Sequence, residues 1–401
     1  MKRYALKANS KGVLTGTHNL SGNEAIIEGA FAAGCRFLGV YPISPSLEAT
    51  DRFLQRSGEV DATFVQMEDE ISALAAVLGA SWTGKKSMSV TSGSGLSNMM
   101  EHIGLGIMLQ TPCVIVNVQR TGPSLGIPNG VAQGDTMQAR WGSHGDYETI
   151  VLTPNSPQEC FDLTIKAFNF SERFRVPVLL LTDAYIAQKK TLVKIPPTKD
   201  LKLISRKLFK GAKNKYLPYK NDKNLVPPMV NVGDGYRFHV TGLTHDERGY
   251  PVMTSECQEA CVRPLMEKIT KYQDEIIEYE EVETDDADVV VISYGATSTV
   301  VSKAISLAKK DGIKVGSFRL ITIWPFPEKR VRKLAQKIDA FVIPEINFGQ
   351  IAFEIERCAA GNCNVFFVPI LGGGLPTPED ICKSIIKASK EKKKIEKLIE
   401  L

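Results

Sequence analysis

Apolar and polar positions in the first half of the chain alternate between short apolar runs and segments with helical periodicity. The segment "SGNEAIIEGAFAAGC" begins with Ser and Asn, which are common helix N-caps, and then repeats apolar residues at helical spacing. The runs "CVIVNVQ" and "VPVLLLTD" are uninterrupted, as in strands that are buried on both faces. Apolar strands separated by helices predict an α/β fold with a parallel sheet covered on both faces.

The same pattern predicts the order of elements between these runs. It predicts a strand at "FLGVYPIS", a helix near 46–56, a strand at "ATFVQM", a helix after Glu68, a strand at "SMSVTS" and a helix beginning at "GSGLSNMMEHIG".

The alternation stops near residue 189 and returns near residue 288. From Lys189 to Lys223 there are 12 Lys or Arg residues against Asp200 and Asp222. A solvated connector or a subunit-docking arm accounts for this stretch better than a nucleic-acid patch, because no set of stacking aromatic residues accompanies it. The acidic segment "QDEIIEYEEVETDDAD" that follows is predicted to be a solvated helix ending in a linker.

A second, smaller α/β domain is predicted after the connector, where "VVVISYG", "KVGSFRL", "AFVIPEI" and "VFFVPIL" alternate with helical segments. In "LGGGLPTPEDI" a glycine-rich turn precedes a Thr N-cap with Pro at the first helical position. We therefore expect a first domain at 20–190, a connector at 191–287, a second domain at 288–388 and a charged C-terminal helix at 389–401.

Composition and charge restrict the class of protein. With 43% hydrophobic and 23% charged residues, the chain has the profile of a soluble globular protein, and 401 residues favour two or three domains. No run of 18 apolar residues predicts a membrane span, and the start of the chain lacks the apolar core of a secretory signal. The net charge of +4 gives no argument for nucleic-acid binding. Eight scattered cysteines indicate reduced core thiols in a cytoplasmic protein, with no metal or iron–sulfur cluster of its own.

Candidate chemistry lies where the predicted strands end, because ligands in open α/β sheets bind outside the carboxyl ends of the strands. There are four such corners, "YPISPS" at 41–46, "MEDE" at 67–70, "TSGSG" at 91–95 and "QRTGPSLGIPN" at 119–129. We expect them to converge on one edge. The prolines of the first corner make its backbone rigid. The glycines of "TSGSG" are a weak signal for a phosphate cradle, since close packing of helix on strand explains them as well.

The acids of the second corner have two possible roles. Compensation of the helix dipole suffices to explain Glu68 and Asp69. Glu70 differs because the helix behind it is almost wholly apolar. A carboxylate there would lose its hydration and could share a proton with a ligand nitrogen.

Arg120 closes an apolar strand, where it could grip a carboxylate with two parallel hydrogen bonds or form a structural ion pair. Two histidines are weaker candidates. His102 lies within a predicted helix and is better explained by packing, whereas His144 lies in a loop that could line a pocket.

Together these motifs resemble the alpha subunit of the 2-oxoacid:ferredoxin oxidoreductases, over about residues 20–385. The resemblance implies a thiamine pyrimidine-binding domain followed by a transketolase C-terminal-like domain. The segments that carry it, in order, are "YPISPS", "EDEISALAAVLGAS", "TSGSGLSNMMEHIG", "QRTGPSLGIP", "RFHVTGLTHDERGYP" and "GSFRLITIWPFP".

The resemblance assigns roles to individual residues. Glu70 lies nine residues before Gly79, the spacing of the thiamine glutamate, so its carboxyl group is expected to share a proton with N1′ of the aminopyrimidine ring. Arg120 is expected to bind the substrate carboxylate. Ser44 and Asn129 stand where related chains have Thr, so they also belong to the expected substrate site and leave the identity of the substrate open. The expected cofactor contacts, besides Glu70, are Pro42, Ile43, Ser92 and Gly93.

The resemblance also implies partners and cofactors. The pyrimidine end of thiamine diphosphate would bind this chain, while a beta subunit would bring the diphosphate site, Mg²⁺ and a [4Fe–4S] cluster. The "GDG" at 233–235 lacks the downstream Asn of a diphosphate site and is interpreted as a turn. Gamma and delta subunits are possible further partners, with coenzyme A and ferredoxin as co-substrates and no nucleic acid.

The expected reaction is oxidative decarboxylation of a 2-oxoacid to acyl-coenzyme A and carbon dioxide with reduction of ferredoxin. 2-Oxoglutarate is the favoured substrate, and branched-chain 2-oxoacids or pyruvate are alternatives. Three other classes of function stay open: the beta subunit of a 2-oxoacid dehydrogenase first component, a non-catalytic scaffold, and a nicotinamide-dependent enzyme, although the last lacks the G-x-G-x-x-G fingerprint.

Overall fold

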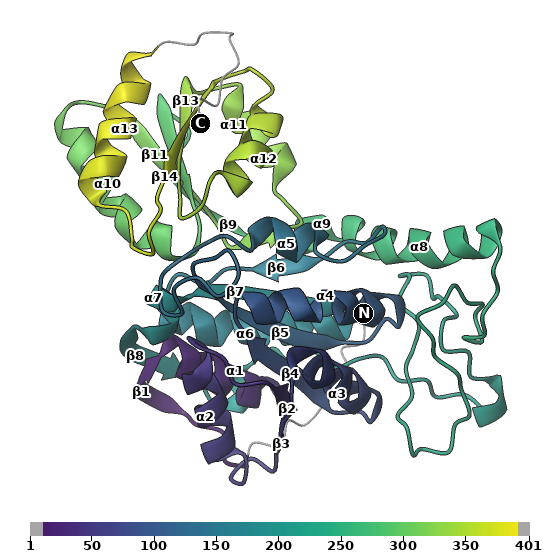
Figure 1. Ribbon diagram of the computed structural model, residues 1–401. Coiled ribbons are helices and arrows are strands. Elements are labelled where there is room, and N and C mark those ends of the chain that lie inside the picture. Colours follow the sequence, from purple (N-terminus) through teal and green to yellow (C-terminus); the bar gives the residue numbers. More distant parts are fainter. Residues whose placement is uncertain (1–10, 392–401) are drawn as a thin grey trace.

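The computed structural model describes residues 11–391, which form two α/β units joined by a connector (Figure 1). The larger sheet has the strand order β12-β6-β7-β5-β4-β2-β3, and it is parallel except for β12. Every residue of β4, β5 and β7 is buried, which confirms the parallel sheet covered on both faces. The strands are β2 (Cys35–Val40), β3 (Thr63–Gln66), β4 (Lys86–Thr91), β5 (Cys113–Gln119), β6 (Ile150–Leu152), β7 (Pro177–Asp183) and β12 (Thr322–Trp324).

The first helix around this sheet begins at the residue that the sequence marks as its cap. Ser21 forms a capping box with Glu24 at the start of the first helix, so two orphan backbone N–H groups are satisfied. A Cβ added at Gly29 would lie 2.5 Å from the carbonyl oxygen of Phe161, so only glycine allows α1 to approach α6 this closely. The helices are α1 (Gly22–Ala33), α2 (Leu47–Arg56), α3 (Glu70–Trp82), α4 (Ser94–Met108), α5 (Thr136–Trp141), α6 (Pro157–Phe174) and α7 (Ala184–Gln188).

The second unit has a sheet in the order β14-β13-β10-β11-β9 with helices on both sides (Figure 1). Helices α10 and α13 pack together, as do α11 and α12. Thr377 caps α13 and Pro378 is its first residue, as predicted. The elements are β9 (Tyr279–Val282), β10 (Val289–Ser293), α10 (Ser298–Lys310), β11 (Val315–Leu320), α11 (Glu328–Ala335), β13 (Ala340–Glu345), α12 (Gln350–Ala359), β14 (Asn364–Pro369) and α13 (Pro378–Lys390). The remainder of the predicted C-terminal helix, 392–401, lies outside the described residues.

The predicted acidic helix is wrong for most of its length. Only α9 (Gln273–Ile276) is helical, and β9 follows it as an edge strand antiparallel to β11. The acids of β9 have cationic partners on other elements, because Glu280 pairs with Arg319 and Glu281 with Arg330. Those partners, which are distant in sequence, offset the low strand propensity of a carboxylate run.

One strand from the sequence of the second unit belongs to the sheet of the first unit. β12 follows β11 in the chain, yet it pairs antiparallel with β6 in the larger sheet. A small separate sheet joins β1 (Gly16–Ser21) to β8 (Lys190–Ile195), so the start of the connector folds back on the first unit.

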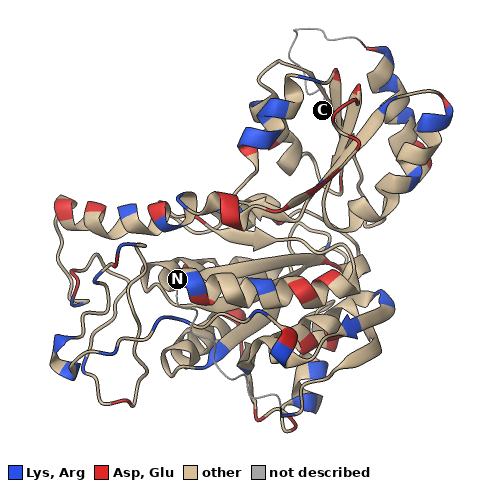
Figure 2. Cartoon of the chain, turned by 180° about the vertical axis from the view of Figure 1, so that it is seen from behind, with Lys and Arg blue, Asp and Glu red and all other residues tan. Residues whose placement is uncertain are grey.

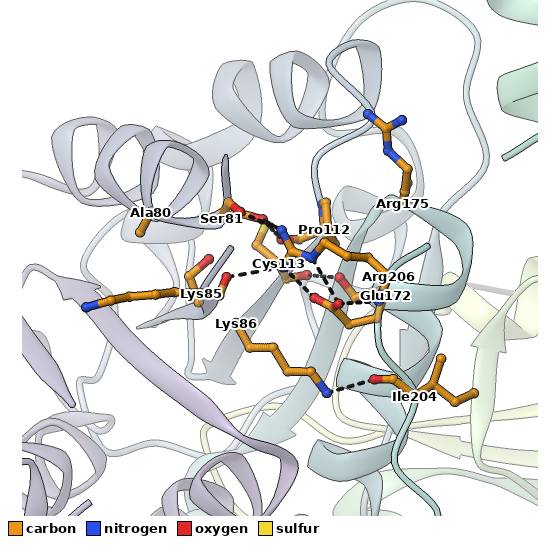
Figure 3. A network of polar contacts seen from close by, with 12 residues as sticks. Ala80, Ser81, Lys85, Lys86, Pro112, Cys113, Glu172, Arg175, Ile204 and Arg206 are labelled. Atoms are coloured by element: carbon orange, nitrogen blue, oxygen red, sulfur yellow. Dashed lines mark hydrogen bonds and ion pairs between the residues drawn. The ribbon is translucent and has the colours of Figure 1, made fainter. Parts of the chain in front are cut away.

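The basic connector is tied to the first unit by a buried ion pair (Figure 3). Arg206 donates to both carboxylate oxygens of Glu172 on α6, at 3.0 and 2.6 Å, and both side chains are at most 5% exposed. Lys86 donates to the carbonyl oxygen of Ile204 at 2.8 Å beside them. Although burial disfavours the charged form, the guanidinium of Arg206 holds the pKa of Glu172 below its ordinary value.

The connector contains α8 (Ser255–Thr270), a long helix that carries charged residues of both signs and is largely exposed (Figure 2). Six of the eight cysteines are buried, whereas Cys257 and Cys261 on α8 are half-buried; none forms a disulfide. Within residues 11–391 no helix is long and apolar enough to cross a membrane.

Candidate functional site

Four neighbouring strands bring the predicted corners to one edge of the larger sheet. The order β5-β4-β2-β3 is parallel throughout, so the segments that follow these strands share an edge. Arg120, directly after β5, donates from Nη1 to the carbonyl oxygen of Ser44 after β2, at 2.7 Å. Gly93, after β4, lies against the same side chain, since a Cβ added there would be 3.2 Å from Nε of Arg120. Two residues further on, Gly95 contacts Glu70 after β3, so all four corners meet as predicted.

Glu70 is the first residue of α3, and its surroundings differ from those of the two acids before it. Its side chain is buried at 4% exposure, whereas Glu68 is exposed. Asp69 is the N-cap, and its carboxylate accepts from the backbone and side chain of Ser72, which lowers the pKa of Asp69. The dipole and capping explanation therefore holds for Asp69 and does not account for Glu70.

The carboxylate of Glu70 accepts a hydrogen bond at one oxygen, and its other oxygen lies beside Gly95. Asn98 of α4 donates from Nδ2 to Oε2 at 3.0 Å. A Cβ added at Gly95 would lie 2.5 Å from Oε1 and 2.1 Å from Oγ1 of Thr91. Glycine at 95 is thus required for the carboxylate to reach this edge, and this arrangement fits the edge of an aminopyrimidine ring at Oε1.

Several polar atoms at the same edge are buried without a hydrogen-bond partner among the described residues. They are Nε of Arg120, Oγ1 of Thr91 and Oγ of Ser92. Buried polar groups are nearly always satisfied in folded proteins, so such a cluster points to groups that a ligand completes. Since Arg120 is a cation that is only 5% exposed, an anionic ligand group fits its free donor.

A second acid stands near Arg120. The side chain of Asp135 accepts from Nδ2 of Asn117 at 2.8 Å, and its backbone N–H donates to Gln119 at 3.1 Å. Burial raises the pKa of Asp135, while the hydrogen bond from Asn117 and the charge of Arg120 oppose the rise. No sequence pattern pointed to Asp135 or to Asn98, because both act through contacts between different elements.

The remaining predicted site residues lie at different depths. Pro42 and Ile43 are half-buried at the corner after β2. Asn129 is exposed in the loop after β5, where it accepts from Gln188 at 3.4 Å, and no described contact joins it to Arg120. His144 is exposed in a loop. His102 lies on α4 beside Glu101, with Nδ1 2.9 Å from that carboxylate.

Metal-ligand sets are absent from the part of the chain that the structure describes, where no three His, Cys, Asp or Glu side chains are placed to hold a metal ion. The "GDG" at 233–235 forms a turn, as predicted from the sequence. Gly233 and Gly235 have φ of 99° and 80°, and the side chain of Asn231 donates to that of Asp234. A hollow of about 840 Å³ lies along α8 and is lined by residues such as Met253 and Gln258, none of which belongs to the predicted site.

Two family models match different parts of the chain. Residues 28–262 match the thiamine diphosphate-binding domain of pyruvate flavodoxin/ferredoxin oxidoreductases, and residues 287–381 match core domain II of pyruvate:ferredoxin oxidoreductase.

Several curated relatives match over nearly their whole length. 2-Oxoglutarate synthase subunit KorA of Methanothermobacter thermautotrophicus is 45% identical over 381 residues, which cover 94% of this chain and 100% of the relative. Subunit KorA of Methanocaldococcus jannaschii is 44% identical, with 92% and 98% covered. Ketoisovalerate oxidoreductase subunit VorB of Methanothermobacter marburgensis is 34% identical, with 92% and 97% covered.

Solved structures agree with these relatives. The 2-oxoglutarate:ferredoxin oxidoreductase from Magnetococcus marinus, with 2-oxoglutarate, coenzyme A and succinyl-CoA bound, superposes with a TM-score of 0.88 and 32% identity over 94% of this chain and 66% of that chain. A split-gene transketolase gives a TM-score of 0.51 at 14% identity over 92% of this chain and 97% of that chain, a likeness of fold alone.

Proposed function

Because the chain belongs to the pyruvate flavodoxin/ferredoxin oxidoreductase family, we propose that it is the alpha subunit of a 2-oxoglutarate:ferredoxin oxidoreductase. The enzyme would convert 2-oxoglutarate, coenzyme A and oxidised ferredoxin to succinyl-coenzyme A, carbon dioxide and reduced ferredoxin. The choice of 2-oxoglutarate is supported by the relatives named 2-oxoglutarate synthase at 44–45% identity. A branched-chain 2-oxoacid is the second candidate, because a ketoisovalerate oxidoreductase subunit is 34% identical.

The observation that carries the proposal is the carboxylate of Glu70, buried beside Gly95 at the edge where Arg120 also lies. Thiamine diphosphate, when bound, supplies the carbon nucleophile and the electron sink for decarboxylation of a 2-oxoacid. Oε1 of Glu70 would exchange a proton with the ring nitrogen of the aminopyrimidine, while Asn98 holds Oε2. The apolar side chains of α3 exclude water, which strengthens that interaction.

The other residues of the edge position the substrate. The free Nε of Arg120 would donate to the 2-oxoacid carboxylate, and the hydrogen bond from Nη1 to Ser44 fixes the guanidinium plane for that contact. The hydroxyl groups of Ser44 and Ser92 would donate to the substrate or the cofactor, and Pro42, Ile43 and Gly93 would form the wall on which the ring rests. Asn129 lies further out on the loop and would act on substrate identity.

The diphosphate, Mg²⁺ and a [4Fe–4S] cluster would be bound by a beta subunit, with gamma and delta subunits as possible further partners and a cytoplasmic location for the complex. The domain limits 20–190, 191–287, 288–388 and 389–401 are part of the same proposal.

The test is to purify the chain with its native partner subunits and to follow viologen reduction with coenzyme A and a panel of 2-oxoacids. We expect the highest kcat/KM with 2-oxoglutarate, followed by branched-chain 2-oxoacids and pyruvate. Glu70→Gln should lower kcat by about 100-fold or more, the usual contribution of a positioned proton-transfer group. The exposed neighbour provides the control, since Glu68→Gln should change kcat little. Unchanged turnover in Glu70→Gln would favour the scaffold alternative, and acylation of lipoamide without viologen reduction would favour the dehydrogenase component.

A further inference from the structure

The loop that follows Arg120 is closed on itself by Thr121. Oγ1 of Thr121 donates to the carbonyl oxygen of Ile127 at 3.0 Å and accepts from its N–H at 2.8 Å. The backbone N–H of Thr121 donates to Gly130 at 3.1 Å, and Arg120 forms an antiparallel bridge with Val131. The loop from Thr121 to Gly130 therefore leaves and re-enters the fold beside Arg120. Its residues 122–129 are all exposed, so its conformation depends on the contacts at its base.

The second unit reaches this base through its glycine-rich turn. The N–H of Val131 donates to the carbonyl oxygen of Gly373 at 3.0 Å, which adds a third segment to the bridge between Arg120 and Val131. In Figure 1 the turn before α13 comes down to the loops that follow β5.

Position 373 strongly favours glycine for two reasons. Its φ is +83°, in the left-handed region. A Cβ there would lie 3.2 Å from the Cα of Gly130 and 3.2 Å from Cγ2 of Thr121, so any side chain would press on the base of the loop. By contrast, Gly374 has no positive φ, and a Cβ added to it would meet nothing within 4 Å.

The segment after Val131 is held by the second unit as well. Gln133 accepts from the N–H of Ile346 at 3.1 Å, its own N–H donates to the carbonyl oxygen of Ile346 at 3.0 Å, and its Nε2 donates to the carbonyl oxygen of Tyr294 at 2.8 Å. Residues 131–133 are thus held by three segments of the second unit, and Arg120 is held through its bridge to the first of these residues.

We propose that Gly373 is a positioning residue for the substrate: the glycine turn of the second unit holds the base of the 121–130 loop and so sets the place of Arg120. This inference rests on the proposed function, because it takes Arg120 as the group that binds the 2-oxoacid carboxylate. The turn acts on substrate binding through Arg120, and its described contacts are with Thr121, Gly130 and Val131, so it should affect KM for the 2-oxoacid more than kcat.

The experiment uses the assembled holoenzyme with Gly373→Ala, the matched control Gly374→Ala, Arg120→Lys and the double variant Gly373→Ala/Arg120→Lys. We expect Gly373→Ala to raise KM for the 2-oxoacid about tenfold, with kcat within about threefold of wild type and KM for coenzyme A unchanged. Gly374→Ala should behave as wild type. The effects of Gly373→Ala and Arg120→Lys on KM should be less than additive, because coupled residues share one interaction.

Hydrogen exchange gives a measurement that does not depend on turnover. In the wild-type complex the Val131 amide should be protected, and Gly373→Ala should speed its exchange together with that of Thr121. Free exchange of Val131 in the wild type would overturn the inference even if Gly373→Ala did not assemble. Additive effects on KM, or an equal rise in KM for coenzyme A, would also overturn it. A wild-type complex without 2-oxoacid activity would instead refute the proposed function, so the two failures are distinguishable.

Discussion

Three consecutive acids lie at the start of α3, the last of them as its first residue, and at the residue scale their surroundings decide their roles. Glu68 is exposed to solvent. Asp69 caps α3 by accepting a hydrogen bond from the N–H of Ser72. Glu70 points inward, toward Asn98 and Gly95. A carboxylate with one oxygen held by an amide and the other beside a glycine is oriented but not saturated, since each oxygen can accept more than one hydrogen bond. Asn98 therefore matters through the direction in which it holds Glu70.

Asn98 provides the prediction that belongs to this scale. Asn98→Ala should lower kcat of the assembled complex about tenfold, the value of one hydrogen bond to a charged group. Asn98→Asp should lower it further, because a second carboxylate would repel Glu70. Kinetics of both variants check this, with Ser97→Ala as the control for a change on the same exposed turn of α4. An Asn98→Asp complex as active as wild type would contradict the role.

At the scale of elements, the sequence predicted those strands and helices whose burial is decided locally. β5 is apolar except for Asn117 and its last residue, and β7 is apolar up to its last two residues, so their pattern sufficed. Thr377 with Pro378 marked the start of α13. β9 was missed because its strand conformation depends on Arg319 and Arg330, which come later in the chain. The corners could be placed on one edge from topology alone, whereas the contact between Asn98 and Glu70 depends on how α4 packs on α3.

The attachment of the connector to α6 can be tested through its buried ion pair. Arg206→Met should lower the free energy of unfolding by about 3–5 kcal/mol, because it leaves Glu172 buried without its cation. The double variant Arg206→Met/Glu172→Met should recover much of that loss. Urea unfolding measures both.

The adjacent residue is a matched control, since Lys207 forms an exposed ion pair with Asp222. Lys207→Met should cost about 1 kcal/mol or less, as is usual for surface pairs. Equal losses for Arg206→Met and Lys207→Met would mean that burial of the pair does not hold the connector.

At the scale of the whole molecule, the two units are joined by polar groups buried between them. Asp183, at the end of β7, caps α7 with Oδ1 and accepts with Oδ2 from the N–H of Ala296 in the second unit, at 3.1 Å. Across the same boundary, the hydroxyl of Tyr294 donates to Glu345 at 2.7 Å and lies 3.3 Å from Oγ1 of Thr136 in the first unit. Since such buried networks are costly when incomplete, they fix one relative placement of the units, and with it the contact between Gly373 and Val131.

Asp183 makes the stability of this junction depend on pH. Burial raises the pKa of Asp183 from 3.8 to about 6, against the three backbone N–H groups that favour its charged form. The folded state therefore binds the proton more tightly than the unfolded state, so the stabilisation is complete below about pH 4 and is lost as the pH rises through about 6. A shift of this size corresponds to about 3 kcal/mol.

Asp183→Asn removes the titration while keeping the cap on α7, so comparison of the two proteins isolates this group from all other acids. The amide cannot accept from Ala296 with its nitrogen, which makes the variant less stable at every pH. The stability advantage of the wild type should nevertheless be larger at pH 4.5 than at pH 7.5, by about 2 kcal/mol. Urea unfolding of both proteins across this range measures the difference. Parallel pH profiles would mean that Asp183 ionises as freely in the folded chain as in the unfolded one, so that its charge at the junction carries no cost in stability at neutral pH.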